Sequence, residues 1–169
     1  MTAILRAQRT LFLASFTLAS ACTVAAQTNP FVGTWKFVPE RSHFDRSAGS
    51  TAPKDIKLRF LIDKDQLRGE IEITLSNGTK RTLVWIPQYD RQEHPLIMSG
   101  ETIHKTHTVL WTRVDDRTIE CRINHDNGLE YTTDRLSVSP DSQTLTQTHS
   151  VKRPDGTAYE QFFVTFVRQ

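Results

Sequence analysis

The chain has few of the residues that cross-link or interrupt a fold: 2 cysteines, 7 glycines and 7 prolines in 169 residues. Cys22 lies in an N-terminal apolar segment, which leaves Cys121 alone and excludes an intramolecular disulfide in the remaining chain. No long segment has apolar residues at helical spacing, so a helical bundle is excluded. No basic run is interleaved with aromatic residues, and we therefore expect no nucleic-acid partner.

The N-terminal segment resembles an export signal. Arg6 and Arg9 precede the apolar residues 11–21, and small side chains follow up to Gln27. We predict a signal peptide over residues 1–26, one domain over residues 27–169, and a periplasmic or secreted location. The stretch "LASAC" also resembles a lipoprotein signal, although Ala19 stands where leucine is usual. The alternative is therefore a lipid anchor at Cys22, the only route to a membrane that we expect.

Loss of the signal changes the charge of the protein. Arg6 and Arg9 lie within residues 1–26 and no acidic residue does, so the balance falls from 21 basic against 19 acidic residues to 19 against 19. The remaining domain is electrically neutral, and the basic isoelectric point of the full chain carries no information about an acidic partner. The domain is long enough to bury a core of its own, and we expect a monomer.

Period-two alternation of apolar and polar residues recurs along nearly the whole domain. In "DIKLRFLI" it places Ile56, Leu58, Phe60 and Ile62 on one face of a strand. The same pattern, bounded by turn residues, predicts nine strands at 33–38, 56–62, 67–75, 79–86, 104–114, 118–124, 129–138, 144–151 and 158–168. Such a meander of half-buried strands folds either as an antiparallel up-and-down barrel of about 8–10 strands or as a β-sandwich.

Short turn sequences connect these strands. "SNGT" at residues 76–79 has the Asn-Gly pair typical of a type I′ turn, in which both central residues have positive φ. "SPDSQT" at 139–144 and "KRPDGT" at 152–157 provide further tight connections. Consecutive strands are therefore expected to be hairpin neighbours.

The first and last strands carry a family resemblance. Gly33-Thr34-Trp35 resembles the Gly-x-Trp motif that begins the first strand of lipocalins and other calycins, and Arg168 resembles the basic residue that these proteins lay across the tryptophan. "NPFVGTWKF", "PERSHF", "QYDRQEHPLIMSG", "RVDDRTIE", "SVSPDSQTLTQT" and "PDGTAYEQFFV" are similar, in this order, to a set of exported bacterial lipocalin-like proteins without an established reaction. The resemblance implies an antiparallel barrel, with Gly33, Trp35 and Arg168 as its closure device.

The resemblance and the alternation together leave the interior open to two interpretations. The apolar faces either line a pocket for a small hydrophobic or amphipathic molecule or fill a solid core. Binding inside the barrel or at its mouth is the first hypothesis, and the candidate ligand-binding residues are Phe60, Tyr89, His94, Trp111 and Tyr131. The alternatives are an enzyme that uses polar residues at the barrel mouth and an interaction module tethered through Cys22.

Histidines and Cys121 give weak signals for other chemistry. His104 and His107 are three apart, which places them on opposite faces of a strand and separates them as metal ligands. His149 resembles the late histidine of some haem-binding barrels, but the glycine-rich continuation of the tryptophan motif is missing, so no cofactor and no metal are expected. Cys121 alternates with Ile119 and Ile123 on an apolar face, where a thiol is usually inert.

Overall fold

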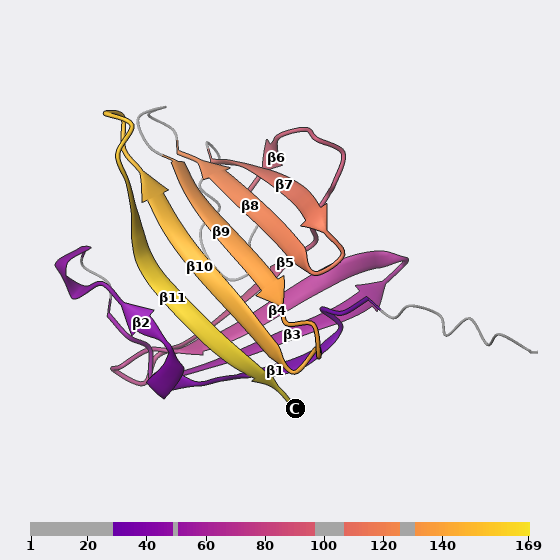
Figure 1. The fold of residues 1–169 in the computed structure, drawn as a ribbon, viewed down its shortest axis with the longest axis horizontal. Helices are drawn as coiled ribbons and strands as arrows, with labels where there is room; N and C mark the ends of the chain where they lie inside the picture. The colour runs from indigo at the N-terminus through magenta and orange to yellow at the C-terminus, as the bar shows by residue number, and fades with distance from the viewer. Residues whose placement is uncertain (1–28, 49–50, 97–106, 126–130) are drawn as a thin grey trace, which may run out of the picture.

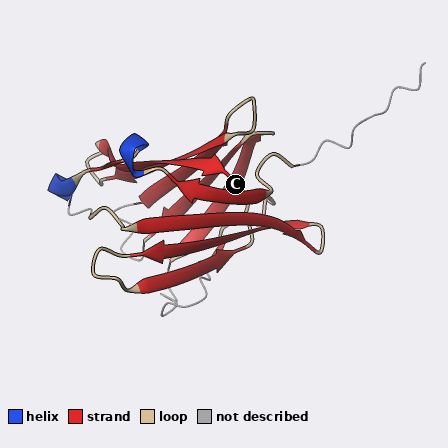
Figure 2. Ribbon diagram, turned by 90° about the horizontal axis from the view of Figure 1, so that it is seen from below, coloured by secondary structure: helices blue, strands red, loops and turns tan. Residues whose placement is uncertain are grey.

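A computed structural model describes residues 29–48, 51–96, 107–125 and 131–169. Residues 1–26, including Cys22, lie outside the described part. The described elements are β1 (Gly33–Phe37), η1 (Pro39–Arg41), β2 (His43–Phe44), η2 (Arg46–Ala48), β3 (Asp55–Asp63), β4 (Gln66–Thr74), β5 (Lys80–Trp85), β6 (His94–Pro95), β7 (Thr108–Asp115), β8 (Thr118–Asn124), β9 (Tyr131–Val138), β10 (Thr144–Lys152) and β11 (Ala158–Arg168). Figure 2 shows that the two short 3-10 helices, η1 and η2, lie at one end of the strands.

All strands belong to one antiparallel sheet that curls into a half-barrel (Figure 1). The order is β5-β4-β3-β1-β11-β10-β9-β8-β7-β6, and β2 pairs with β11 beside this path. The predicted antiparallel barrel-like fold is confirmed. The sandwich alternative fails because β1 pairs with both β3 and β11, which joins the two walls into a single sheet.

The nine predicted strands are found close to their expected bounds. Residues 104–106 of the fifth predicted strand and residues 129–130 of the seventh lie outside the described part. β7 begins at Thr108 and β9 at Tyr131. The sequence analysis missed β2 and β6, which are two residues long and too short to show alternation. β2 follows β1 along the same edge of β11, because β1 pairs with its end and β2 with residues Phe162 and Phe163.

The prediction of a type I′ turn at Asn77-Gly78 is wrong. Gly78 has a φ of +85°, but Asn77 is not in the left-handed region, and the Leu75 N–H donates to the Thr79 carbonyl across a three-residue loop. In such loops a type I turn is followed by one left-handed residue, here glycine. The pair with two positive φ values is instead Lys64-Asp65, between β3 and β4. These residues lack the glycine on which the sequence prediction relied.

The apolar faces of the strands point into the half-barrel, as the alternation predicts. Leu58, Leu145 and Phe166 have no exposed surface, and they come from three different strands. Ile62 was expected on the same buried face, but 49% of it is exposed because it lies near the end of β3, beyond the packed interior. The core therefore occupies the centre of the curled sheet.

The first and last strands meet in the middle of the sheet, where Trp35 is opposite Arg168. The Arg168 guanidinium lies 4.3 Å from the centre of the Trp35 ring and donates to the carbonyls of Pro30 and Val32. Gly33 has a φ of +142°, and a Cβ at this position would lie 2.6 Å from an Arg168 nitrogen. Glycine therefore leaves the room in which the guanidinium covers the indole.

The strand path ends at β5 on one side and β6 on the other. Among the described residues, no ladder connects β5 to β6 or β7, although they follow one another in the chain. Residues 86–93 link β5 to β6 without regular structure. Among the described strands, the open side of the half-barrel therefore lies between β5 and the β6–β7 pair, and the β1–β11 pair lies in the middle of the strand path.

Candidate functional site

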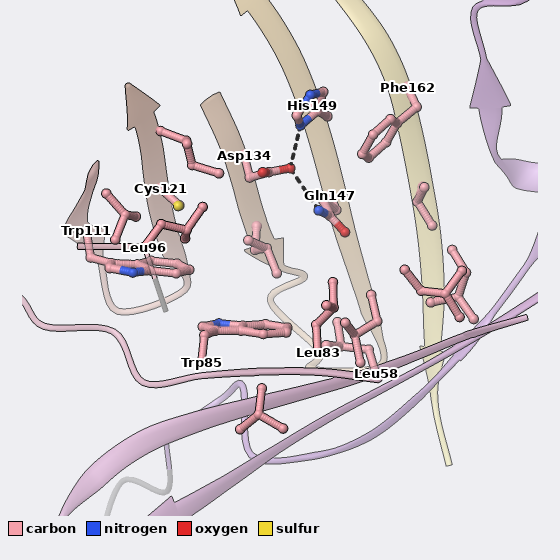
Figure 3. Close-up of a pocket in the computed structure, with 18 of the residues that line it drawn as sticks. Leu58, Leu83, Trp85, Leu96, Trp111, Cys121, Asp134, Gln147, His149 and Phe162 are labelled. Carbon is pink, nitrogen blue, oxygen red and sulfur yellow. Dashed lines mark hydrogen bonds and ion pairs between the residues drawn. The ribbon is translucent and has the colours of Figure 1, made fainter. Parts of the chain in front are cut away.

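A cleft of about 930 Å³ lies within the curl of the sheet. Most of its lining is apolar, and its aromatic side chains are Phe44, Trp85, Trp111 and Phe162. Figure 3 shows Trp85 and Leu83 on one wall, Trp111 and Leu96 at the side, and a group of polar side chains on the opposite wall. The cleft therefore combines a large apolar surface with a smaller number of polar side chains, three of which are grouped on one wall.

The polar group consists of Asp134 on β9 with Gln147 and His149 on β10. Asp134 Oδ1 accepts a hydrogen bond from Gln147 Nε2 at 2.9 Å and lies 2.9 Å from His149 Nδ1 (Figure 3). Only 15% of the His149 side chain and 17% of the Asp134 side chain are exposed. We call these three residues the polar cluster. Because they point into the cleft, their remaining polar atoms are the ones that a bound molecule would meet.

Strand register explains how these residues come together. Trp111 pairs with Cys121, Cys121 with Asp134, Asp134 with His149, and His149 with Phe162, so one inward row crosses β7 to β11. The Phe162 ring stacks on His149 at a centroid distance of 4.6 Å and an angle of 7°. A bulge falls between His149 and Ser150. Bulges redirect side chains next to binding sites, and this one adjoins the polar cluster.

The facing wall depends on a close contact between Trp85 and Gly69, which are opposite each other in β5 and β4. A Cβ on residue 69 would lie 2.7 Å from Trp85 Nε1, so only glycine allows the indole to lie against the strand. Phe60 packs edge-on against the same indole at 6.0 Å. The Trp85 Nε1 is buried and donates no hydrogen bond to the described residues. The absence of a side chain at Gly69 therefore determines where the Trp85 indole lies.

Two of the five candidate ligand-binding residues line the cleft, namely His94 and Trp111. His94 Nε2 lies 2.9 Å from both carboxylate oxygens of Asp90, and this hydrogen bond lowers the pKa of Asp90. Phe60 is 1% exposed and lies behind Trp85, so it supports the cleft without lining it.

Tyr89 and Tyr131, the other two candidate residues, do not line the cleft. Tyr89 packs against the core, and burial raises its pKa to about 12, with Arg113 partly offsetting the rise. It is not among the residues that line the cleft. Tyr131 lies between Arg122 and Lys152, at 5.6 and 5.5 Å. It is out of phase with the inward positions Asp134 and Leu136, and it therefore belongs to the outer face of the sheet.

The sequence analysis missed Asp134 and Gln147, and considered His149 only as a haem ligand. One signal was present: each of the three is in phase with apolar residues of its own strand, such as Leu136 on β9 and Leu145 on β10. A polar residue in such a position points inward and requires a partner. Which residues would be partners depends on strand register, and the sequence alone does not specify register.

Cys121 has the environment of an unreactive thiol. It is 3% exposed and lines the cleft next to Asp134. Burial raises the pKa of the Cys121 thiol, and the Asp134 and Glu120 carboxylates raise it further. The nucleophile in cysteine chemistry is the thiolate, which these surroundings disfavour.

Fold and site together define an antiparallel half-barrel with an apolar cleft and one polar cluster. Comparison of the chain with models of known families finds no match, and comparison with curated proteins finds none either. Within the described part, no three His, Cys, Asp or Glu side chains are grouped so as to hold a metal ion. None of the helices described there is long and apolar enough to cross a membrane.

Proposed function

We propose that the protein binds a small hydrophobic or amphipathic molecule in the cleft. The observation that carries this proposal is the cleft itself: about 930 Å³, lined mainly by aliphatic and aromatic side chains. Ligand pockets in proteins typically have about 300–1,000 Å³ and a predominantly apolar lining with a few polar groups. A solid core would leave no such volume, because protein interiors are close-packed.

The position of the cleft supports the same function. Leu83 and Trp85 belong to β5, whereas Val109 and Trp111 belong to β7, and all four side chains line the cleft. These strands flank the open side of the half-barrel. A bound apolar molecule would therefore contact both β5 and β7. It would supply apolar contacts between these two strands, which do not pair with each other.

Fluorescence titration with N-phenyl-1-naphthylamine, a neutral lipophilic reporter, tests the proposal. We expect saturable enhancement with the wild-type protein and a severalfold weaker response with Leu83→Trp, because the larger side chain fills part of the cleft. Thr82→Trp is the matched control, since it adds the same indole to an exposed position of the same strand. Absence of a saturable signal, or equal loss in both variants with the fold retained, would contradict binding in the cleft.

We also propose that the protein is exported and that the mature chain begins at Gln27. The support is the arrangement of Arg6, Arg9 and the apolar residues 11–21, together with the resemblance to exported lipocalin-like proteins. Mass spectrometry of the mature protein from its native host tests this. A chain starting at Gln27 is expected, whereas a diacylglyceryl group on Cys22 would establish the lipid-anchored alternative.

A further inference from the structure

We propose that the polar cluster of Asp134, Gln147 and His149 receives the polar end of the bound molecule and selects a hydrogen-bond donor there. The preferred ligand is an apolar chain that ends in an ammonium or hydroxyl group, and a carboxylate end is disfavoured. This inference rests on the proposed function, because it specifies the chemistry of a ligand in the same cleft.

The location of the cluster is the first argument. In the row that crosses the sheet, Asp134 and His149 lie between Cys121 and Phe162, and the rows beside them contain Leu136 and Val164. A carboxylate and two further polar side chains on such a wall lose hydration that their mutual hydrogen bonds only partly replace. Apolar side chains at these positions would stabilise the core more. We therefore attribute the polar cluster to recognition of a ligand.

The free atoms of the cluster are the second argument. Asp134 Oδ1 accepts the hydrogen bonds from both Gln147 and His149, whereas Oδ2 accepts no hydrogen bond from the described residues. Gln147 donates through its amide nitrogen, which leaves its carbonyl oxygen as an acceptor. A carboxylate oxygen only accepts, so His149 Nδ1 is the donor in its contact with Asp134. The cluster therefore offers acceptors to the cleft.

Charge is the third argument. Arg68 is the only arginine or lysine among the described residues that line the cleft. Its guanidinium lies 2.9 Å from Glu70 and 3.8 Å from Asp63, so its charge is paired with two carboxylates, although its buried Nε donates no hydrogen bond to the described residues. A ligand carboxylate placed at the polar cluster would face the Asp134 carboxylate, and no described arginine or lysine belongs to the cluster. Juxtaposed like charges oppose binding strongly in a site removed from water.

The stacking of His149 on Phe162 adds orientation to this chemistry. The parallel rings, together with the bond to Asp134, hold the imidazole plane in one direction. Phe44 packs against the far side of the row, 5.8 Å from Phe162. The acceptors are thus presented by side chains whose positions are set before a ligand arrives, which reduces the entropy lost on binding.

Competition among three ligands of equal chain length tests the proposal. Dodecylamine, dodecanol and dodecanoate, each below its aggregation concentration, would displace N-phenyl-1-naphthylamine from the full protein. We expect half-displacement by the amine and the alcohol at concentrations roughly tenfold or more below that for dodecanoate, about 1.4 kcal/mol of discrimination. Equal displacement by all three, or a preference for dodecanoate, would overturn the proposal.

Two variants locate the discrimination in the polar cluster. Asp134→Asn removes the negative charge and should reduce the preference for amine over carboxylate to less than about threefold. Glu120→Gln is the matched control: it removes a carboxylate from the neighbouring strand, where Glu120 pairs with Arg135 on the outer face, and should leave the preference unchanged. An unchanged preference in Asp134→Asn would contradict the assignment.

Gln147→Met provides a second variant if Asp134→Asn does not fold, as judged by circular dichroism. It removes one acceptor at similar volume and is expected to weaken amine and alcohol binding severalfold while dodecanoate changes little. Equal weakening of all three ligands would contradict a role in recognising the polar end. If the reporter itself does not bind to the wild-type protein, the proposed function fails. If it binds but the three competitors are equivalent, only this inference fails.

Discussion

At the scale of single residues, Trp35 connects several parts of the fold. Its ring has no exposed surface, its Nε1 donates to the Phe31 carbonyl at 2.9 Å, and Arg168 covers one face. Arg168 in turn donates from Nε to the Ser142 carbonyl at 2.6 Å, in the turn between β9 and β10. One residue pair therefore holds together the start of the described chain, the sheet centre and a distant turn.

Trp35→Ala should cost about 3–5 kcal/mol of unfolding free energy, the range for a buried aromatic side chain. The cavity left behind also exposes the underside of the Arg168 guanidinium, which loses its cation–π contact. Urea denaturation measures the change. Arg168→Lys is the companion variant. It should lose less stability than Trp35→Ala, because lysine keeps the positive charge but not the two hydrogen bonds to the Pro30 and Val32 carbonyls. A fully stable Trp35→Ala protein would contradict this account.

Gly69→Ala should destabilise the protein by about 1–3 kcal/mol and displace Trp85, because the new methyl group overlaps the indole. A change in tryptophan fluorescence and weaker reporter binding are expected along with the lower stability. Gly156→Ala is the control: its φ of +83° makes alanine costly by about 1–2 kcal/mol, but nothing lies within 4 Å of the added Cβ. Reporter binding should therefore fall only in Gly69→Ala.

Tyr89 predicts a loss of stability at alkaline pH. Burial raises its pKa to about 12 in the folded protein, against about 10 in an unfolded chain. Between these values the unfolded phenol ionises while the folded one stays protonated, so stability falls as pH rises from about 10 towards 12. Urea denaturation of wild type and Tyr89→Phe over this range measures the effect. Tyr89→Phe should lose less stability than the wild type over this range. The raised pKa of Cys121 also lowers stability at alkaline pH, but it does so in both proteins and therefore cancels in the comparison.

At the scale of elements, alternation predicts strands well where a strand is long and one face is wet. β3, β8 and β11 begin or end within a residue of the predicted bounds for this reason. The short β2 and β6 carry no pattern, because two residues cannot show a period. The turn at residues 76–79 differs from the prediction because glycine at the third loop position satisfies a different hairpin geometry from the one that Asn-Gly usually adopts.

The candidate site was less predictable than the strands. Trp111 was named as a candidate and lines the cleft. The outward position of Tyr131 follows from the alternation of β9, once Asp134 and Leu136 are known to point inward. The polar cluster required more, because Asp134, Gln147 and His149 meet only in one register of β9 against β10. A shift of one residue would turn every one of these side chains to the other face.

The polar cluster also predicts an unusual pattern of stability. Asp134→Leu should cost about 1–3 kcal/mol, since Gln147 Nε2 and His149 Nδ1 lose their acceptor inside the cleft. Asp134→Leu combined with His149→Leu should recover most of this loss, because apolar replacements of buried pairs are often neutral or stabilising. Urea denaturation of the single and double variants measures both values. If the double variant instead lost the sum of the two single losses of unfolding free energy, Asp134 and His149 would each stabilise the fold. That result would weaken the argument for recognition.

At the scale of the whole molecule, the position of β1 sets where the fold is strongest. β1 and β11 lie in the middle of the strand path, and the buried residues with no exposed surface lie on β1, β3, β10 and β11. β5 and β6 end the path, and three of the six β5 residues are exposed. Local opening is therefore expected to begin at the free edges and to reach β1 and β11 only on global unfolding.

Hydrogen exchange measures this gradient and connects it to the cleft. In the free protein, amides of β1 and β11 should exchange slowest and those of β5 fastest among the long strands. A molecule in the cleft contacts Leu83 on β5 and Trp111 on β7, so opening at β5 also dismantles its site. With N-phenyl-1-naphthylamine at 100 times its Kd, the opening should become about 100-fold rarer, equivalent to about 2.7 kcal/mol. At the same reporter concentration the slowing at β5 should be severalfold smaller in Leu83→Trp, in which the cleft is partly filled. Slowing confined to strands away from the open side would place the bound molecule elsewhere, because only a ligand that spans β5 and β7 has to be released before that edge opens.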